Sequence, residues 1–427
     1  MLFYFIYVFV APILLPLLFF FSFFSKKLKI RRNLTWKSIG VAKQGILKNR
    51  DGRKVIIFHA ASTGEFEQLV PILKLVKRDQ FYIILSFFSP TVYLKMNQTS
   101  LADGVCFHPY DLIIFSFLFF KKLNPNQYVV VRHDIWPTHI LMAKLFQVKT
   151  TLINANLYSE SLRLKSPFIL FNRWVFKNFN QILTPSYRIA KNFNKLLPHS
   201  EIIVTGDSRF DQMLFRKKNN KQPSIFSDTN RVKTIIFGSI NESDYDIIFQ
   251  ALKQFFPKGD ASLKEKKIKL IVVPHEVDHK TIDEIVCMLK GLNMEPTLHS
   301  QNKKSKVNVA IVDSIGILAD LYKHCDLAYI GGGFGKDKIF GQSGVHSVIE
   351  PCAYELITCY GPNIKILDEA IEMVEEGIGF VIQNSSEMIS CFTMLGNEIK
   401  ALQLKQKMKD YLSLKLGSSV KISNYIT

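Results

Sequence analysis

Patterns that bind metals or nucleotides in well-known ways are scarce in this 427-residue chain. Its six cysteines form no Cys-x-x-Cys pair, and none lies beside histidines at zinc-ligand spacing, so we expect no metal site. Reduced thiols in the cytoplasm are then the default. The glycine-rich stretches contain neither the Gly-Lys-Ser/Thr of a Walker A loop nor a GxGxxG followed by a ribose-binding acid, which argues against both of those nucleotide folds.

Acidic side chains are also in short supply. There are 36 of them against 55 lysines and arginines, which gives a formal net charge of +19. Such an excess attracts anionic partners, whether nucleic acid, an anionic membrane surface or a phosphorylated substrate. Because no nucleic-acid-binding motif or basic-aromatic stripe accompanies the charge, we do not expect nucleic acid to be the partner.

Residues 1–25 contain no charged side chain at all and are dominated by Phe, Leu, Ile and Val. About 20 apolar residues suffice for a helix to cross a bilayer, so residues 1–32 are predicted to form a membrane anchor ending in a basic collar. The positive-inside rule places the rest of the chain in the cytoplasm. A cleaved signal peptide is disfavoured because there is no basic start and no small-residue cleavage site. A shallow interfacial hairpin bent at two prolines remains open. The basic collar comprises Lys26, Lys27, Lys29, Arg31 and Arg32.

Short apolar runs then alternate with amphipathic stretches, which is typical of a parallel sheet covered by helices. A polar stretch at 216–233 interrupts the alternation and is predicted to be a linker. We therefore expect an α/β protein with two Rossmann-like domains, at 33–215 and 234–398. A C-terminal helical segment at 399–427 follows, and we expect it to pack back on the first domain. The predicted strands are 54–59, 81–87, 129–132, 150–154, 234–238, 268–274, 307–312, 327–331 and 356–360, and a helix is expected over 65–76. The nine-residue run 112–120 is too short to span a bilayer, so a buried helix is favoured over a membrane-touching patch.

The first candidate site follows the strand at 54–59, where small residues lead to Gly64 and then Glu65. A carboxylate at this position has the chemistry to act as a general base on a sugar hydroxyl. The alternative is purely structural: Glu65 complements the helix dipole, and Ser62 or Thr63 caps the helix.

Other strand ends carry polar residues as well. Asp134 follows the strand at 129–132, and His275 follows the strand at 268–274. Gly238, Ser239 and Asn241 follow the first strand of the second domain, where backbone donors can bind phosphate, although a turn and a helix cap explain them equally well.

The densest cluster of candidates begins with the glycines at 331–335. Glycines let a ligand approach the backbone closely. A glutamate that opens the following helix is well placed to hold ribose hydroxyls. The candidates here are Gly332, Gly333, His346, Ser347 and Glu350.

Taken together and in order, these segments resemble the Kdo transferases, which add 3-deoxy-D-manno-octulosonic acid (Kdo) to lipid A. The resemblance runs from the N-terminus to about residue 363. It is carried by FHAASTGEFEQLVPIL (58–73), VTGDSRFDQM (204–213), VDSIGILADLYKHCDLAYIGGGF (312–334), GVHSVIEPCAYE (344–355) and GPN (361–363).

The resemblance implies a GT-B fold of two facing domains and a location at the inner membrane. It also implies inverting transfer of Kdo from CMP-Kdo to a lipid A precursor (lipid IVA), without metal or cofactor, at an anionic leaflet. Glu65 matches the family's catalytic base, and Ser62, Thr63, Gly64 and Asp134 fall in its acceptor-binding region. The donor-binding positions correspond to Gly238, Ser239, Asn241, His275, Gly316, Gly332, Gly333, His346, Ser347 and Glu350.

The sequence departs from the family pattern at three places. Arg132 and His133 precede Asp134 where many members carry Glu-x-Glu-x-Trp-Pro, and Pro274-His275-Glu276 stands in place of Pro-Arg-His. Residues 336–343 enlarge the glycine loop. Two other functions stay open: a GT-B transferase that uses a UDP-sugar on a lipid-linked acceptor, and a non-catalytic, membrane-anchored nucleotide-sugar binder.

Overall fold

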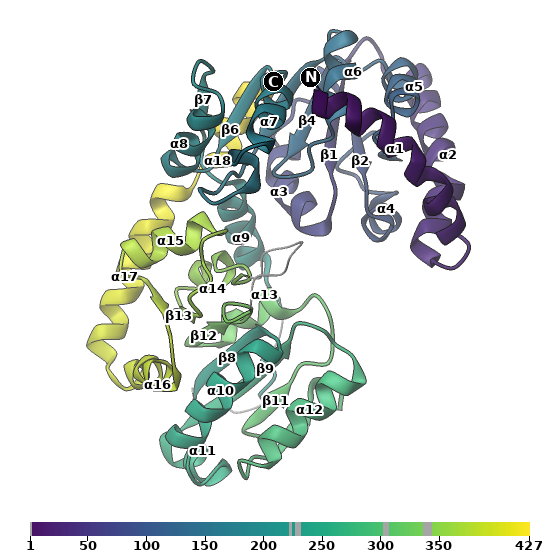
Figure 1. Ribbon diagram of the computed structural model, residues 1–427. Coiled ribbons are helices and arrows are strands. Elements are labelled where there is room, and N and C mark those ends of the chain that lie inside the picture. Colours follow the sequence, from purple (N-terminus) through teal and green to yellow (C-terminus); the bar gives the residue numbers. More distant parts are fainter. Residues whose placement is uncertain (1, 222–223, 227–231, 302–306, 336–343) are drawn as a thin grey trace. The chain divides into compact units, whose positions relative to one another are not determined.

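The chain divides into two compact units, which Figure 1 shows in a computed structural model. Unit 1 comprises Met1–Gln212 and Lys415–Thr427, and unit 2 comprises Met213–Leu414. The structure describes residues 2–221, 224–226, 232–301, 307–335 and 344–427. The enlargement of the glycine loop expected at 336–343 therefore lies outside the described residues.

Unit 1 is built on a seven-stranded parallel sheet in the order β3-β2-β1-β4-β5-β6-β7. This is the doubly wound arrangement, in which the strand order reverses between β1 and β4 and ligands bind beyond the carboxyl ends of those strands. The strands are β1 (Lys54–Ala60), β2 (Phe81–Phe87), β3 (Gly104–Phe107), β4 (Gln127–Val131), β5 (Lys149–Ile153), β6 (Gln181–Thr184) and β7 (Ile202–Val204).

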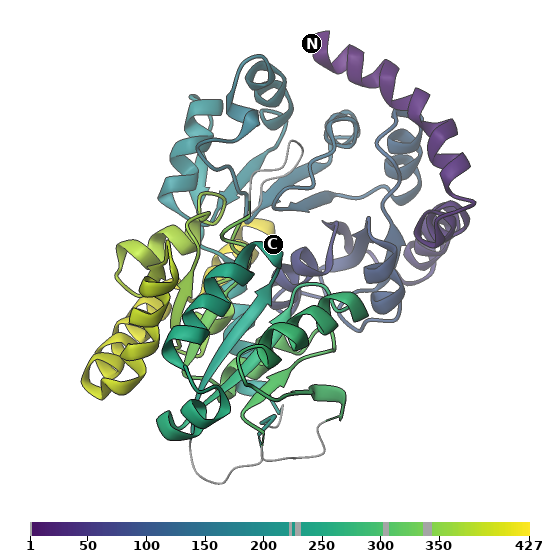
Figure 2. The ribbon, with the colours of Figure 1, turned by 60° about the horizontal axis from the view of Figure 1, so that its bottom comes forward.

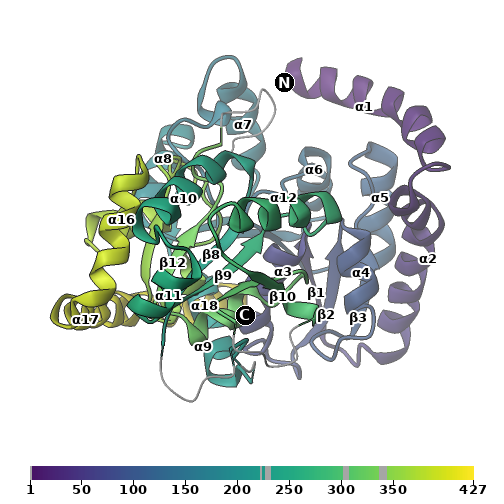
Figure 3. The same cartoon turned by 90° about the horizontal axis from the view of Figure 1, so that it is seen from below.

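Helices connect these strands and cover the sheet. Helix α2 runs along the edge strand β3 and contacts α5, and Figure 3 shows these two helices side by side. The helices are α1 (Leu2–Phe21), α2 (Lys26–Asn49), α3 (Thr63–Leu73), α4 (Pro90–Met96), α5 (Ile113–Leu123), α6 (Pro137–Leu145), η1 (Leu162–Leu164), α7 (Phe168–Phe176), α8 (Tyr187–Leu196) and α18 (Ser418–Ile426). Helix α9 (Ser208–Asn219) carries the chain into unit 2.

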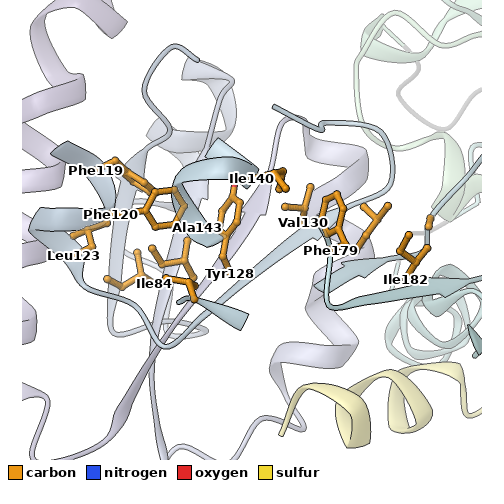
Figure 4. Packing of buried hydrophobic residues seen from close by; sticks show 14 of the residues in the cluster. Ile84, Phe119, Phe120, Leu123, Tyr128, Val130, Ile140, Ala143, Phe179 and Ile182 are labelled. Atoms are coloured by element: carbon orange, nitrogen blue, oxygen red, sulfur yellow. The ribbon is translucent and has the colours of Figure 1, made fainter. Parts of the chain in front are cut away.

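The sheet of unit 1 is buried on both faces. Along β1, Val55 and Ile57 join one apolar cluster, whereas Ile56 and Phe58 join the other. Figure 4 shows part of the first cluster, with Tyr128 and Val130 of β4 near Ile140 of α6. Burial on both faces explains why the central strands are continuous apolar runs in the sequence.

Unit 2 repeats this plan with a second seven-stranded parallel sheet, in the order β10-β11-β9-β8-β12-β13-β14. Its order reverses between β8 and β12, which predicts a ligand site beyond their carboxyl ends. The strands are β8 (Lys233–Ile240), β9 (Ile268–Pro274), β10 (Pro296–Leu298), β11 (Val309–Ile311), β12 (Leu327–Ile330), β13 (Ile357–Tyr360) and β14 (Gly379–Val381).

The helices of unit 2 include α10 and α16, which pack against each other. The helices are α10 (Glu242–Phe255), α11 (Asp260–Lys266), α12 (His279–Lys290), η2 (His299–Gln301), α13 (Leu318–Leu321), η3 (Tyr322–His324), α14 (Ile349–Ala353), α15 (Asp368–Glu375), α16 (Ser385–Thr393), η4 (Met394–Gly396) and α17 (Glu398–Lys415). Helix α17 buries Leu404 and Met408 in unit 2. The next helix, α18, adds Ile422 and Ile426 to the core of unit 1.

The apolar N-terminal segment forms α1, which lies on the outside of unit 1 (Figure 2). The Tyr7 hydroxyl donates a hydrogen bond to Asp111 Oδ2 at 2.8 Å, and the rings of Tyr4 and Trp174 lie 4.6 Å apart. Within the described part of the chain, no helix combines the length and the apolar character that crossing a bilayer requires.

One member of the predicted basic collar has a different environment from the one expected. Arg31 is buried, donates hydrogen bonds to the carbonyls of Phe88 and His108, and lies over the rings of Phe88 and Tyr110. This arginine therefore ties α2 to the loops that follow β2 and β3 and does not face a membrane surface.

The predicted alternation of strands and helices is confirmed. The strands at 81–87 and 268–274 match residue for residue, while the others shift at their ends by one to two residues. The helix expected at 65–76 begins earlier, at Thr63, and ends at Leu73. In the run 112–120, Phe119 and Phe120 are buried, whereas Ile113 and Ile114 are exposed. The stretch predicted as a linker begins inside α9, and residues 222–223 and 227–231 of it lie outside the described residues.

Candidate functional site

The polar site of unit 1 lies at the reversal point of its sheet, beyond β1 and β4. Ser62 caps α3 by accepting a hydrogen bond from the Glu65 amide at 3.3 Å. The side chain of Glu65 reaches back toward the residues that precede α3, and its Oε2 accepts a hydrogen bond from the Ala61 amide at 2.6 Å. The cap at Ser62 holds the carboxyl end of the strand and the first turn of the helix in one geometry. Thr63 and Gly64 form that first turn and are exposed.

Glu65 is 9% exposed. Burial raises the pKa of its carboxyl group because the charged form loses hydration, and the nearby charge of Asp134 adds to the rise. The Ala61 amide, His59 and Arg132 oppose that rise by favouring the charged form. A buried carboxyl group with a raised pKa beyond the ends of two neighbouring strands is a functional-site candidate on physical grounds.

Asp134 is held by a neighbour on the adjacent strand. Its Oδ2 lies 2.5 Å from Nε2 of His59, and His59 Nδ1 lies 3.0 Å from the carbonyl of Ser86. Burial disfavours the charged form of Asp134, but the His59 hydrogen bond and charge outweigh it and keep the pKa of Asp134 below its usual value. The carboxylate therefore stays ionised beside Glu65.

Unit 2 contains a pocket of about 260 Å³ at the reversal point between β8 and β12. Six of the ten predicted donor-site residues line it: Gly238, Ser239, Gly316, His346, Ser347 and Glu350. The remaining lining residues are Arg216, Leu318, Ala319, Tyr322 and Ile330.

Two buried polar atoms of this pocket are unsatisfied. Nε2 of His346 and Oε2 of Glu350 make no hydrogen bond to any described residue. Because buried polar groups normally have a partner, such atoms in a pocket wall suit a bound polar ligand. Burial, together with the charge of His275, lowers the pKa of His346 to about 4, so this imidazole is neutral at pH 7.

His275 joins the same site although it does not line the pocket. Its ring stacks on that of His346 with centroids 4.4 Å apart, and its Nδ1 lies 2.8 Å from the hydroxyl of Ser239. The structure thus brings together residues that follow β8, β9 and the glycine loop.

The other predicted donor residues lie elsewhere. Asn241 forms the capping box of α10 with Asp244. A Cβ on Gly332 would come 2.6 Å from the Gly344 carbonyl oxygen, and one on Gly333 would come 2.6 Å from the Gly361 backbone. These two glycines therefore allow close packing of the loops behind the pocket and do not line it.

Three residues that sequence reasoning missed belong to this site. Arg216 lines the pocket and pairs with Asp320 at 2.8 Å, and Tyr322 forms part of the wall. Asp244 accepts a hydrogen bond from the Gly332 amide at 2.9 Å and another from the Tyr329 hydroxyl at 2.7 Å, so it fixes the glycine loop. Asp244 lies three residues after Asn241. That spacing predicts a capping box but does not predict the hydrogen bonds from Gly332 and Tyr329.

Comparison with known proteins agrees with this picture. Residues 35–212 match the family described as 3-deoxy-D-manno-octulosonic-acid transferase (kdotransferase). The chain is 29% identical over 369 residues to the 3-deoxy-D-manno-octulosonic acid transferase of Aquifex aeolicus, covering 85% of this chain and 92% of the relative. It is 24% identical over 382 residues to the enzyme of that name from Rickettsia felis, covering 88% of this chain and 78% of the relative.

Solved structures resemble the fold. A UDP-GlcNAc 2-epimerase from Neisseria meningitidis bound to UDP-GlcNAc has a TM-score of 0.59 at 14% identity, covering 87% of this chain and 99% of its own. A glycosyltransferase from Rickettsia africae has a TM-score of 0.55 at 14% identity, covering 88% and 98%.

Two doubly wound units, each with polar residues gathered where its sheet reverses, define a GT-B-like fold. More particularly, residues 35–212 match the Kdo transferase family, and the chain is similar to Kdo transferases over most of its length. The two expected Rossmann-like sheets are thereby confirmed.

Proposed function

We propose that the protein transfers Kdo from CMP-Kdo to a lipid A precursor, lipid IVA, by an inverting displacement that needs no metal. The observation that carries this proposal is Glu65: a buried carboxyl group at the reversal point of a doubly wound sheet, with a raised pKa. The match of residues 35–212 to the Kdo transferase family, and the similarity of most of the chain to Kdo transferases, support the choice of sugar and acceptor.

In the proposed step, Glu65 takes the proton of an acceptor hydroxyl while that oxygen bonds to the anomeric carbon of Kdo. The bond between this carbon and the phosphate oxygen breaks, and CMP leaves with the electron pair. A general base of this kind contributes typically 10²–10⁴-fold to the rate. The raised pKa strengthens Glu65 as a base.

The pocket of unit 2 is the proposed donor site. Glu350, with its unsatisfied Oε2, would accept hydrogen bonds from the ribose hydroxyls of CMP. Ser239, His275 and Arg216 would face the phosphate, since a guanidinium group suits phosphate oxygens in charge and geometry. Arg216 would then supply the cation that the Pro274-His275-Glu276 loop lacks.

We further propose that α1 attaches the protein to the anionic cytoplasmic leaflet of the inner membrane. Phe9, Ile13 and Leu17 are 71%, 68% and 52% exposed, which leaves an apolar surface on the helix. Because Tyr7 is bonded to Asp111, we favour a helix that lies in the interface over one that spans the bilayer. Exposed lysines such as Lys26 and Lys29 would add about 1 kcal/mol each at such a surface.

Kdo transfer from CMP-Kdo to lipid IVA in detergent tests the proposal, with the intact protein compared with Glu65→Gln. Glu67→Gln is the matched control, because Glu67 lies two residues further along α3 and accepts a hydrogen bond from Gln212. We expect Glu65→Gln to lose about 10²- to 10⁴-fold in kcat while CMP binding is retained, and the control to keep its rate. Equal rates for all three proteins would reject Glu65 as the base. No product from a folded intact protein would reject the reaction itself.

A further inference from the structure

Two arginines converge on one residue of unit 1, where the sequence departs from the family pattern. We propose that Arg132 and Arg163, both oriented by His133, bind a phosphate group of the acceptor. This inference rests on the proposed function, because it takes the acceptor to be a phosphorylated lipid. The two arginines would determine which acceptors are used and take no part in the proton transfer.

His133 makes one hydrogen bond to each arginine. Nε of Arg132 donates to Nε2 of the His133 ring at 3.1 Å, and Nη2 of Arg163 donates to the His133 carbonyl oxygen at 3.3 Å. Arg132 directly follows β4, and Arg163 lies in η1. Two side chains that are about 30 residues apart in the sequence therefore converge on one residue at the carboxyl edge of the sheet.

The backbone of Arg132 adopts a conformation that side chains rarely take. Its φ is +57°, in the left-handed region, which costs a residue other than glycine about 1 kcal/mol or more. Strain of this size persists where the surrounding structure imposes it, and it clusters at ligand-binding sites. Here it directs the chain out of β4 so that His133 and Asp134 can reach different partners.

The ring of His133 accepts from Arg132 only if it is neutral. Desolvation and the charges of Arg132, Arg163 and Arg209 lower the pKa of His133 to about 3, so the ring is neutral at pH 7, and Nε2 accepts in the tautomer that carries its proton on Nδ1. The third arginine of this group is engaged differently, because Arg209 binds Asp207 through two of its nitrogens at 2.9 and 2.6 Å. We assign Arg132 and Arg163 to the ligand because both bond to His133.

This pair lies within electrostatic reach of the proposed base. The charge of Arg132 acts on Glu65, and the charge of Asp134 acts on Arg163. An acceptor hydroxyl at Glu65 would thus place a phosphate on the same sugar headgroup near the two guanidinium groups. Guanidinium groups recognise phosphate through paired hydrogen bonds, which a lysine cannot reproduce.

Three anions could satisfy such a pair: the acceptor phosphate, the carboxylate of the donor sugar, or the phosphate of a bulk membrane lipid. We assign the acceptor phosphate because the cluster belongs to unit 1, together with Glu65. The proposed donor residues line the pocket of unit 2.

The experiment measures KM and kcat in detergent without added phospholipid for Arg132→Ala and Arg163→Ala. Arg50→Ala is the control, since Arg50 is an exposed arginine of the same unit. Each protein is given lipid IVA and then its analogues that lack one phosphate. We expect both variants to raise KM for lipid IVA roughly 10- to 100-fold with little change in kcat, and Arg163→Lys to recover only part of the loss. With the analogue lacking the recognised phosphate, intact protein and variants should give the same KM.

Two results would overturn the assignment. An equal loss on all acceptors would show that the arginines do not recognise acceptor phosphate, and a rise in KM for CMP-Kdo alone would assign them to the donor carboxylate. Failure of the proposed function is distinguishable, because the intact protein itself would then transfer no Kdo.

Discussion

The imidazole of His59 and the carboxylate of Asp134 lie 2.5 Å apart, at the carboxyl ends of the neighbouring strands β1 and β4. This pair fixes an ionised carboxylate beside Glu65, whose own pKa is raised by burial and by Asp134. The two acids of this site thus differ in their environments, which shift the pKa of Asp134 down and that of Glu65 up.

Asp134→Asn should therefore change the pH dependence of transfer. A base works when deprotonated, so kcat/KM falls as the pH drops through the pKa of Glu65, which is raised above its ordinary value. Without the charge of Asp134, that pKa falls and the acidic limb moves to lower pH. The measurement is kcat/KM against pH, with the exposed Asp79→Asn as control. An unmoved limb would contradict the electrostatic coupling.

Glu350→Gln should weaken donor binding. Glutamine retains an acceptor and the shape but removes the charge, so we expect KM for CMP-Kdo to rise about 10-fold or more while kcat changes less. The unliganded variant should be as stable as the intact protein or more stable, because a buried oxygen without a partner costs free energy. Isothermal titration with CMP and a thermal melt measure the two effects. Glu376→Gln, at an exposed position of the same unit, is the control.

Asp244→Asn should loosen the glycine loop. Asp244 accepts from the Gly332 amide and the Tyr329 hydroxyl, and burial raises the pKa of its carboxyl group in spite of these hydrogen bonds. Asparagine presents one acceptor oxygen where aspartate presents two, so we expect a loss of about 1–3 kcal/mol in stability. Amide hydrogen exchange at Gly332 should quicken, and KM for the donor should rise. Unchanged exchange at the Gly332 amide would show that Asp244 stabilises only the capping box of α10.

Arg31→Ala should destabilise unit 1 strongly. The change removes a buried guanidinium group and leaves the carbonyls of Phe88 and His108 without their donor, at a cost of about 2–4 kcal/mol. Lys29→Ala, at an exposed position of the same helix, should cost less than about 0.5 kcal/mol. Urea unfolding followed by circular dichroism compares the two. Equal midpoints would mean that Arg31 contributes nothing to stability.

Charges placed on α1 should release the protein from membranes. We expect the double variant Phe9→Asp and Ile13→Asp to lose flotation with vesicles that contain anionic lipid, because both side chains are exposed and apolar. Leu402→Asp, at a similarly exposed apolar position in α17, should float as the intact protein does. Flotation that persists in the double variant would assign attachment to another surface.

Much of the fold could be predicted from the sequence, because its central strands are buried on both faces and read as apolar runs. The short outer strands were not predicted: β7 and β10 have three residues each, all only half-buried, so their apolar signal is too short to mark a strand. Arg216 shows a different difficulty. It opens a polar, basic stretch that reads as a linker, yet it lies in α9 and lines the pocket.

The candidate sites likewise contain some residues that a local sequence pattern reveals and others that depend on tertiary contacts. Strand-end positions such as Ser239 could be found because parallel sheets gather ligands at one edge. The predicted ligand contact of Gly332 and Gly333 stays a prediction, and what the structure adds is that their small size lets neighbouring loops pack closely. The arginine pair at His133 depends on a contact between β4 and η1 that no local pattern reveals.

Unit 1 is discontinuous in the sequence, because α18 supplies Ile422 and Ile426 to a core otherwise made of residues before Gln212. During synthesis, that core must wait with an open face until all of unit 2 has been translated. The core of unit 1 can therefore be completed only after unit 2 has been synthesised, although most of unit 1 is synthesised first. Expressing residues 1–212 alone would yield a sheet with a missing helix, and linking residues 415–427 directly to that fragment would be the way to obtain unit 1 by itself.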